Sequence, residues 1–138
     1  ALHEAAHLAA ARHRKVKLVP RQWTTGAVLA LALTPFHMAT GPFFGARFEA
    51  ADNERVAHLH VVAPVANLLA AGGFWLLYLW RPSPLALIAC SVQLAVAAYS
   101  LLPRPSLDGH PISKERPVLH TLLTMAVGIA GAVLLVSA

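Results

Sequence analysis

The sequence predicts an all-α, multi-pass membrane protein: a transmembrane helical core with a short re-entrant or β-hairpin element after its first helix. Hydrophobic residues make up 57% of the chain and charged residues only 12%, whereas an ordinary soluble domain carries about 25% charged residues. Three stretches contain no Asp, Glu, Lys or Arg, and each reaches the roughly 20 residues that a helix needs to cross a hydrocarbon core. These stretches are residues 61–80, 82–103 and 117–138.

The first elements along the chain are short. Residues 1–12 read as the C-terminal half of a helix that ends at a basic cluster, so we expect residues 1–138 to be a core domain whose N-terminal helix is truncated. Alternation over residues 16–20 predicts a short strand. Residues 26–39 are apolar but too short for a full span, which predicts a re-entrant element, and a polar loop follows over residues 41–58.

Three long helices are predicted at residues 57–80, 84–102 and 117–137, with a Pro-rich break between the last two at residues 103–117. Trp75, Tyr78 and Trp80 cluster at the end of the first of these helices. Amphipathic rings of this kind commonly settle at the level of the lipid headgroups. The cluster therefore predicts a membrane surface near residue 80.

The net charge of +5 at pH 7 fits membrane orientation better than nucleic-acid binding. The basic residues gather beside the apolar stretches, in residues 12–21 and 104–116, and are not interleaved with aromatic residues. Positively charged loops favour the cytoplasmic side. If residues 24–40 dip into the membrane and return, both basic segments lie on that side, and we expect the functional site nearer the cytoplasm.

Cys90 is the only cysteine, which excludes a disulfide within this chain.

The strongest indication of function is the run His3-Glu4-Ala5-Ala6-His7. Residues i and i+4 of a helix lie on one face, so the two imidazoles can bind one cation while Glu4 lies beside it. Two histidines with a carboxylate base are the first part of a zinc hydrolase site. The alternative is a histidine-rich helix end whose imidazoles are solvated.

A catalytic zinc site with two histidines needs a third protein ligand and keeps one position for water. Glu49, Asp52 and Glu54 fall in the predicted polar loop, and Glu115 lies among basic residues, where solvated charges are expected. Asp108 differs because it stands at the edge of an uncharged span, and an acidic residue at such a place is a functional candidate.

These motifs resemble those of the site-2 proteases, which are intramembrane zinc metalloproteases that cut transmembrane segments of anchored regulatory proteins. His3 to His7 matches the metal motif of the family, and the run from Leu101-Leu102-Pro103 to Leu107-Asp108-Gly109 matches its Asn-x-x-Pro-x-x-x-Leu-Asp-Gly motif. Ala63-Pro64-Val65-Ala66-Asn67 is similar to its Gly-Pro-x-x-Asn segment. The resemblance covers nearly the whole chain.

The resemblance implies that His3, His7 and Asp108 hold one Zn²⁺ per chain, with Glu4 as the catalytic base. Hydroxide would then be available at neutral pH, and Glu4 would move the proton to the leaving amine. The implied partners are a membrane-anchored protein substrate and the lipid bilayer, without nucleic acid. The sequence indicates no oligomeric state.

Substrate-binding roles are expected for Asn67, Gly26 and Ser100. The Gly26 region would offer a sheet edge to an unwound substrate, and Ser100 stands where the family usually has Asn. For Asn67 an interhelical hydrogen bond is an equal alternative. Ser100, Ala63 and His110-Pro111 depart from the family pattern.

We therefore expect a zinc-dependent intramembrane endopeptidase. Two alternatives stay open: a catalytically weak or inactive membrane subunit, which the departures motivate, and a metal transporter that uses the same three ligands. His110 is a candidate contact of Asp108, although a solvent-facing loop position is the stronger expectation. Four further histidines show no metal-binding spacing and are predicted to be satisfied or interfacial: His37, His58, His60 and His120.

Overall fold

The computed structural model describes residues 2–22, 44–49, 52–105 and 107–137. Within these ranges the chain is mostly helical. In chain order the elements are α1 (Leu2–Arg14), β1 (Lys17–Gln22), β2 (Phe44–Glu49), α3 (Asn53–Trp80), α4 (Pro84–Ser100), α5 (Gly109–Glu115) and α6 (Pro117–Ser137).

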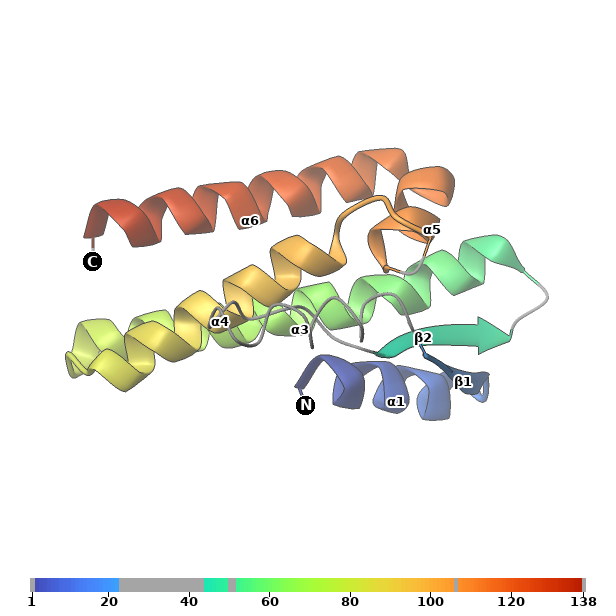
Figure 1. The fold of residues 1–138 in the computed structure, drawn as a ribbon, viewed down its shortest axis with the longest axis horizontal. Helices are drawn as coiled ribbons and strands as arrows, with labels where there is room; N and C mark the ends of the chain where they lie inside the picture. Colours follow the sequence, from blue (N-terminus) through green and yellow to red (C-terminus); the bar gives the residue numbers. More distant parts are fainter. Residues whose placement is uncertain (1, 23–43, 50–51, 106, 138) are drawn as a thin grey trace.

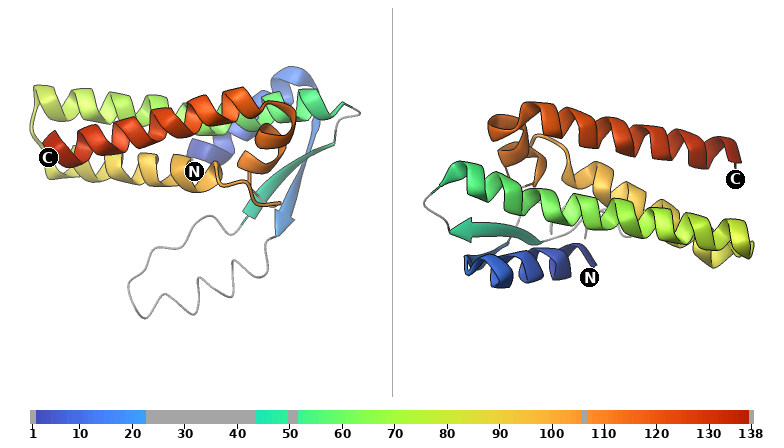
Figure 2. Two further views of the ribbon diagram at one scale, coloured as in Figure 1. Left: turned by 90° about the horizontal axis from the view of Figure 1, so that it is seen from above. Right: turned by 180° about the vertical axis from the view of Figure 1, so that it is seen from behind.

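The longest helix, α3, runs the length of the molecule and contacts most of the other elements (Figure 1). Helix α4 returns along it, and α6 lies beside both, as two further views also show (Figure 2). Helix α5 joins the end of α4 to the start of α6. Asp52 caps α3, because its side chain accepts a hydrogen bond from the backbone N–H of Glu54 and so satisfies a free donor of the first turn.

An apolar core lies between α3, α4, α5 and α6. Ala63 of α3 and Ala97 of α4 are fully buried, and small side chains at such positions let neighbouring helices approach closely. Leu101 and Ile112 are buried in the same core. They fix the end of α4 against α5, and this contact positions the residues between them.

Helix α1 and strand β2 pack against the first half of α3, whereas β1 pairs with β2 and packs against α1 (Figure 1). The strands are antiparallel, with Lys17 paired to Glu49 and Gln22 paired to Phe44. Two strands alone are marginally stable in water. The sheet is stabilised by a cluster of three buried side chains that joins α1, β2 and α3. These are Ala11, Phe48 and Leu59.

Side-chain contacts gather the two basic segments at the N-terminal end of α3. Nη2 of Arg55 donates a hydrogen bond to the carbonyl oxygen of Arg14, at the end of α1, over 3.4 Å. Arg116, which follows α5, forms an ion pair with Glu54. The basic residues near Arg14 and those near Arg116 therefore lie at one end of the helical core.

Helices α3 and α6 are long and apolar enough to cross a membrane, and α4 is a shorter apolar helix. Large apolar side chains of α6 are exposed, among them Leu122, Ile129, Val133 and Val136. An apolar helix with an uncovered outer face is unfavourable in water and needs a lipid or protein neighbour.

The structure confirms several of the predicted elements. The strand predicted at residues 16–20 is β1, and the helices predicted at residues 84–102 and 117–137 are α4 and α6. The expected helical core with a short β element after its first helix is confirmed in outline, because the described residues are mostly helical and β1 and β2 form a two-stranded antiparallel sheet after α1. The re-entrant element predicted at residues 26–39 lies outside the described residues.

Two predicted loops are wrong in part. Strand β2 and the first turn of α3 occupy the segment predicted as a polar loop, because polar residues here pair across a sheet or cap a helix. Helix α5 lies inside the predicted Pro-rich break. Pro111 sits in the first turn of α5, where a missing N–H leaves no intrahelical hydrogen bond unmade.

Candidate metal centre

Helix α1 presents His3 and His7 toward α3. Their rings meet edge to face with centroids 4.8 Å apart, as expected for residues one helical turn apart. His7 is 1% exposed, and His3 is half-buried. Nδ1 of His7 is buried without a hydrogen-bond partner among the described residues, so its described polar contacts are made through Nε2.

Asp108 lies beside both imidazoles, although it follows His7 by 101 positions. Its Oδ2 lies 3.0 Å from Nε2 of His3 and 3.3 Å from Nε2 of His7, and its Oδ1 lies 3.1 Å from the same nitrogen of His7. One ligand atom from each residue falls within 4.8 Å of the others. The side chains predicted as zinc ligands therefore converge, and Asp108 is 5% exposed at this place.

Gly109 explains how the backbone brings Asp108 to the histidines. A Cβ atom added at Gly109 would lie 2.0 Å from the carbonyl oxygen of Leu101, so no side chain fits there without a backbone shift. The start of α5 thus lies directly against the end of α4. Glycine at position 109 is therefore a geometric requirement of this contact.

The carboxyl group of Asp108 is stabilised in its ionised form. Burial by itself would raise the pKa of Asp108, but hydrogen bonds from His3, His60 and His7 outweigh burial and hold that pKa well below its usual range. A carboxylate is the form that binds a cation.

His60, for which the sequence predicted no metal-site role, also contacts Asp108. Its Nδ1 lies 2.6 Å from Oδ1 of Asp108, and the side chain is buried on α3. The ring of Phe48 packs edge to face on His60, with centroids 4.9 Å apart. The available sequence signal was a histidine within an uncharged helical stretch, which by itself indicates no partner.

Asn67 lies on α3 beside the other imidazole. Its Nδ2 is 2.9 Å from Nδ1 of His3, whereas its buried Oδ1 has no partner among the described residues. A half-turn of the amide exchanges these two atoms, and Oδ1 then accepts a hydrogen bond from a protonated Nδ1 of His3. In a metal-bound state, that tautomer would leave the lone pair of Nε2 free for the cation, in place of the contact of Nε2 with Asp108. The observed contact is interhelical, from α3 to α1.

The other predicted site residues have different surroundings. Glu4 follows His3 in the first turn of α1, and its half-buried side chain makes no hydrogen bond or ion pair with a described residue. Ser100 is buried, and its hydroxyl donates to the carbonyl oxygen of Ala97 in its own helix. No contact with the three candidate ligands is described for Ser100. Gly26 lies outside the described residues.

The remaining histidines are separate from this cluster in the described part of the chain. His120 meets the prediction of a satisfied histidine, because its Nε2 lies 2.8 Å from the carbonyl oxygen of Leu101. His58 is exposed, and His110 is half-buried without a described contact to the Asp108 side chain. His37 lies outside the described residues.

The converging side chains offer a donor set that suits a zinc ion. Two imidazole nitrogens and one carboxylate oxygen are the donor set of many catalytic zinc sites. Tetrahedral zinc with bonds of about 2.0 to 2.1 Å separates a nitrogen and an oxygen ligand by roughly 3.3 Å. The distances of 3.0 and 3.3 Å from Oδ2 of Asp108 to the two Nε2 atoms are close to that separation.

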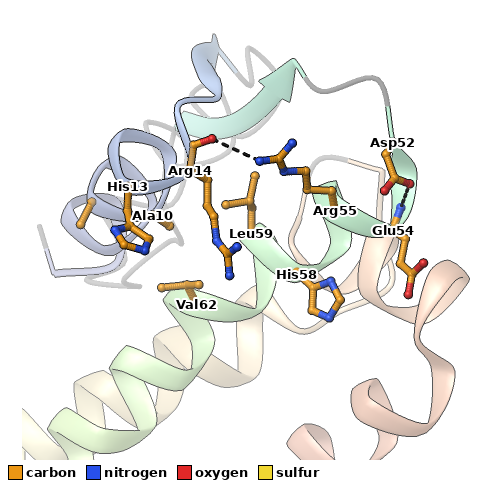
Figure 3. A pocket seen from close by; sticks show the side chains of 10 residues that line it. Ala10, His13, Arg14, Asp52, Glu54, Arg55, His58, Leu59 and Val62 are labelled. Atoms are coloured by element: carbon orange, nitrogen blue, oxygen red, sulfur yellow. Dashed lines mark hydrogen bonds between the residues drawn. The ribbon is translucent and has the colours of Figure 1, made fainter.

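A cavity of about 740 Å³ lies beside the cluster, between the second half of α1 and the first turns of α3. Figure 3 shows Arg14 and His13 on one side of it and Arg55 and His58 on the other. The three candidate ligands are not among the residues that line it. The cavity and the candidate metal centre are therefore neighbouring but distinct features of the contact between α1 and α3.

Comparison of the chain with protein-family models, with curated proteins and with solved structures gave no match. The chemistry of His3, His7 and Asp108 is therefore the basis for assigning a function.

Proposed function

We propose that this chain is the core of a zinc-dependent intramembrane endopeptidase that cleaves transmembrane segments of membrane-anchored proteins. The observation that carries the proposal is the position of Asp108, whose carboxylate lies 3.0 Å from Nε2 of His3 and within 3.3 Å of Nε2 of His7. Solvated histidines at a helix end would not be expected to meet a buried acidic residue from a distant part of the chain.

Three side chains would hold the zinc ion: His3, His7 and Asp108. A zinc ion bound there would supply Lewis acidity and lower the pKa of its water toward about 7. Asn67 orients the imidazole of His3 through its contact with Nδ1. Burial of His7 and Asp108 excludes bulk water from this part of the site, which strengthens electrostatic interactions there.

Glu4 is the group proposed to move protons. It is adjacent to His3 on the first turn of α1, and no described residue occupies its carboxylate with a hydrogen bond or ion pair. A carboxylate in this position can take a proton from water and later give it to the amine of the cleaved bond. General acid–base catalysis of this type contributes about 10²- to 10⁴-fold to a rate.

The proposed location is a membrane, with several passes and the metal centre nearer the cytoplasmic side. Support comes from α3 and α6, which are long and apolar enough to span, and from the exposed apolar face of α6. The contacts Arg55 to Arg14 and Arg116 to Glu54 bring both basic segments to one end of α3. The positive-inside rule assigns such an end to the cytoplasm.

The decisive experiment is cleavage of a model transmembrane substrate by protein reconstituted into lipid vesicles. We expect wild-type protein to cleave it, and Glu4→Gln to lose at least about 100-fold in rate. Glu115→Gln is the matched control, because Glu115 is an exposed carboxylate at the end of α5, and it should cleave as wild type does. Equal cleavage by wild type and Glu4→Gln would overturn the proposal.

Metal measurements separate the proposal from its two alternatives. We expect one tightly held zinc per chain, which His7→Ala should lose. Zinc retained without any substrate cleavage would indicate a non-catalytic membrane subunit. Transfer of zinc into sealed vesicles, at a rate that depends on His7, would indicate a transporter instead.

A further inference from the structure

The closest polar contact of the Asp108 carboxylate is with His60. Nδ1 of His60 lies 2.6 Å from Oδ1 of Asp108, compared with 3.0 to 3.3 Å for the contacts of that carboxylate with His3 and His7. His60 is 7% exposed. A hydrogen bond of this length to a carboxylate is of the strong, charge-assisted kind.

The two oxygens of Asp108 have different neighbours. Oδ1 contacts His60 and also lies 3.1 Å from Nε2 of His7, whereas Oδ2 is the oxygen near Nε2 of both His3 and His7. A donor on Oδ1 restricts rotation of the carboxylate about its last bond. It thereby keeps Oδ2 directed to the place where the two imidazole nitrogens meet.

Packing holds His60 itself in place. Phe48 of β2 lies edge to face against His60 and against His7, with ring centroids 4.9 and 5.4 Å away. Phe48 belongs to the buried cluster with Ala11 and Leu59 that joins α1, β2 and α3. The imidazole of His60 is therefore held by a cluster to which α1, β2 and α3 all contribute.

We propose that His60 is a positioning residue of the metal centre: its Nδ1–H donates to Oδ1 of Asp108 and so presents Oδ2 as the carboxylate ligand. This inference rests on the proposed function only insofar as the centre binds zinc. Partners that orient metal ligands from outside the coordination sphere typically contribute 10- to 100-fold to metal affinity. His60 reaches the site from α3, which contributes none of the three ligands.

Three substitutions distinguish the contribution of the His60 hydrogen bond from the contribution of the volume of its ring. In His60→Phe the ring remains but the donor is lost, whereas in His60→Ala both are lost. His60→Asn keeps an N–H donor, because Nδ2 of Asn is attached to Cγ as Nδ1 of His is. His58→Phe is the matched control, since His58 is an exposed histidine two positions earlier on α3.

The measurement is zinc affinity of the reconstituted protein, obtained by competition with a chromophoric chelator, together with the visible absorption spectrum of the Co²⁺-substituted protein. We expect His60→Phe and His60→Ala to bind zinc about 10- to 100-fold more weakly than wild type and to show an altered Co²⁺ spectrum. His60→Asn should recover most of the affinity, and His58→Phe should match wild type.

Two results would overturn the inference. One is wild-type zinc affinity in His60→Ala. The other is His60→Asn binding as weakly as His60→Ala, because the ring rather than its donor would then matter. If His60→Phe does not fold, the comparison of the Asn and Ala variants still decides between these outcomes. The proposed function fails separately, if wild-type protein binds no zinc, or binds zinc but does not cleave.

Discussion

Nε2 of His7 lies 3.1 and 3.3 Å from the two carboxylate oxygens of Asp108, across 101 positions of sequence. Both side chains are buried, and the segment that carries Asp108 is held by the packing of α4 against α5. The fold therefore builds one polar cluster inside an otherwise apolar helical core.

Replacing Asp108 with Asn should remove tight zinc binding while keeping the size of the side chain. The neutral amide is a far weaker zinc ligand than a carboxylate, and it loses charge attraction to the cation. We expect zinc content, measured by mass spectrometry of metals after dialysis, to fall from about one per chain to near zero. Asp52→Asn, at the exposed cap of α3, should keep its zinc. Full zinc content in Asp108→Asn would contradict the ligand assignment.

A methyl group at Gly109 should displace Asp108. Because the added Cβ would meet the Leu101 carbonyl oxygen at 2.0 Å, we expect Gly109→Ala to lower the free energy of unfolding by about 1–3 kcal/mol, as overpacking commonly does. Zinc affinity should fall with it. Thermal unfolding in detergent provides the measurement.

Gly128→Ala is the control for Gly109→Ala. Gly128 lies in α6, and a Cβ there would meet nothing within 4 Å. Alanine in a helix interior is more favourable than glycine by about 0.5–1 kcal/mol, so this variant should be at least as stable as wild type. Equal stability of the two alanine variants would refute the close contact between α5 and α4.

Asn67 should influence zinc through His3. Removing the amide in Asn67→Ala leaves Nδ1 of His3 without its described partner, and we expect zinc affinity to fall about 10-fold. Asn53→Ala, at the exposed start of α3, should have no such effect. Chelator competition measures both. An unchanged affinity in Asn67→Ala would exclude an orienting role and leave a purely interhelical one.

Orientation in the membrane can be tested with single cysteines in a Cys90→Ser background. Lys15 and Lys114 lie in the two basic segments, whereas Arg81 lies at the opposite end of α3. We expect Lys15→Cys and Lys114→Cys to react with an impermeant maleimide from the cytoplasmic side, and Arg81→Cys from the other side. Labelling of all three from one side would contradict the spanning arrangement.

Much of the arrangement was predictable from sequence because its signals are local. The spacing of His3 and His7 on one helical face, and the isolated position of Asp108 beside an uncharged stretch, each select a small set of candidates. The long apolar helices α4 and α6 were predicted close to their observed bounds. An apolar run of such length is compatible with few structures other than a helix.

The rest depended on contacts between distant residues. His60 is separated from Asp108 by 48 positions, and no spacing in the sequence joins them. Strand β2 was missed because its residues form a strand only by pairing with β1. The close approach of Gly109 to the carbonyl oxygen of Leu101 likewise depends on how the chain turns between α4 and α5. The sequence alone does not specify the path of that turn.

Diffraction from zinc-loaded crystals at the zinc absorption edge tests the central claim most directly. We predict one anomalous peak per chain, about 2.0–2.2 Å from Nε2 of His3, Nε2 of His7 and Oδ2 of Asp108, with Oδ1 still hydrogen-bonded to His60. A zinc-replete protein with no peak at this place, or with zinc bound by other side chains, would contradict the account.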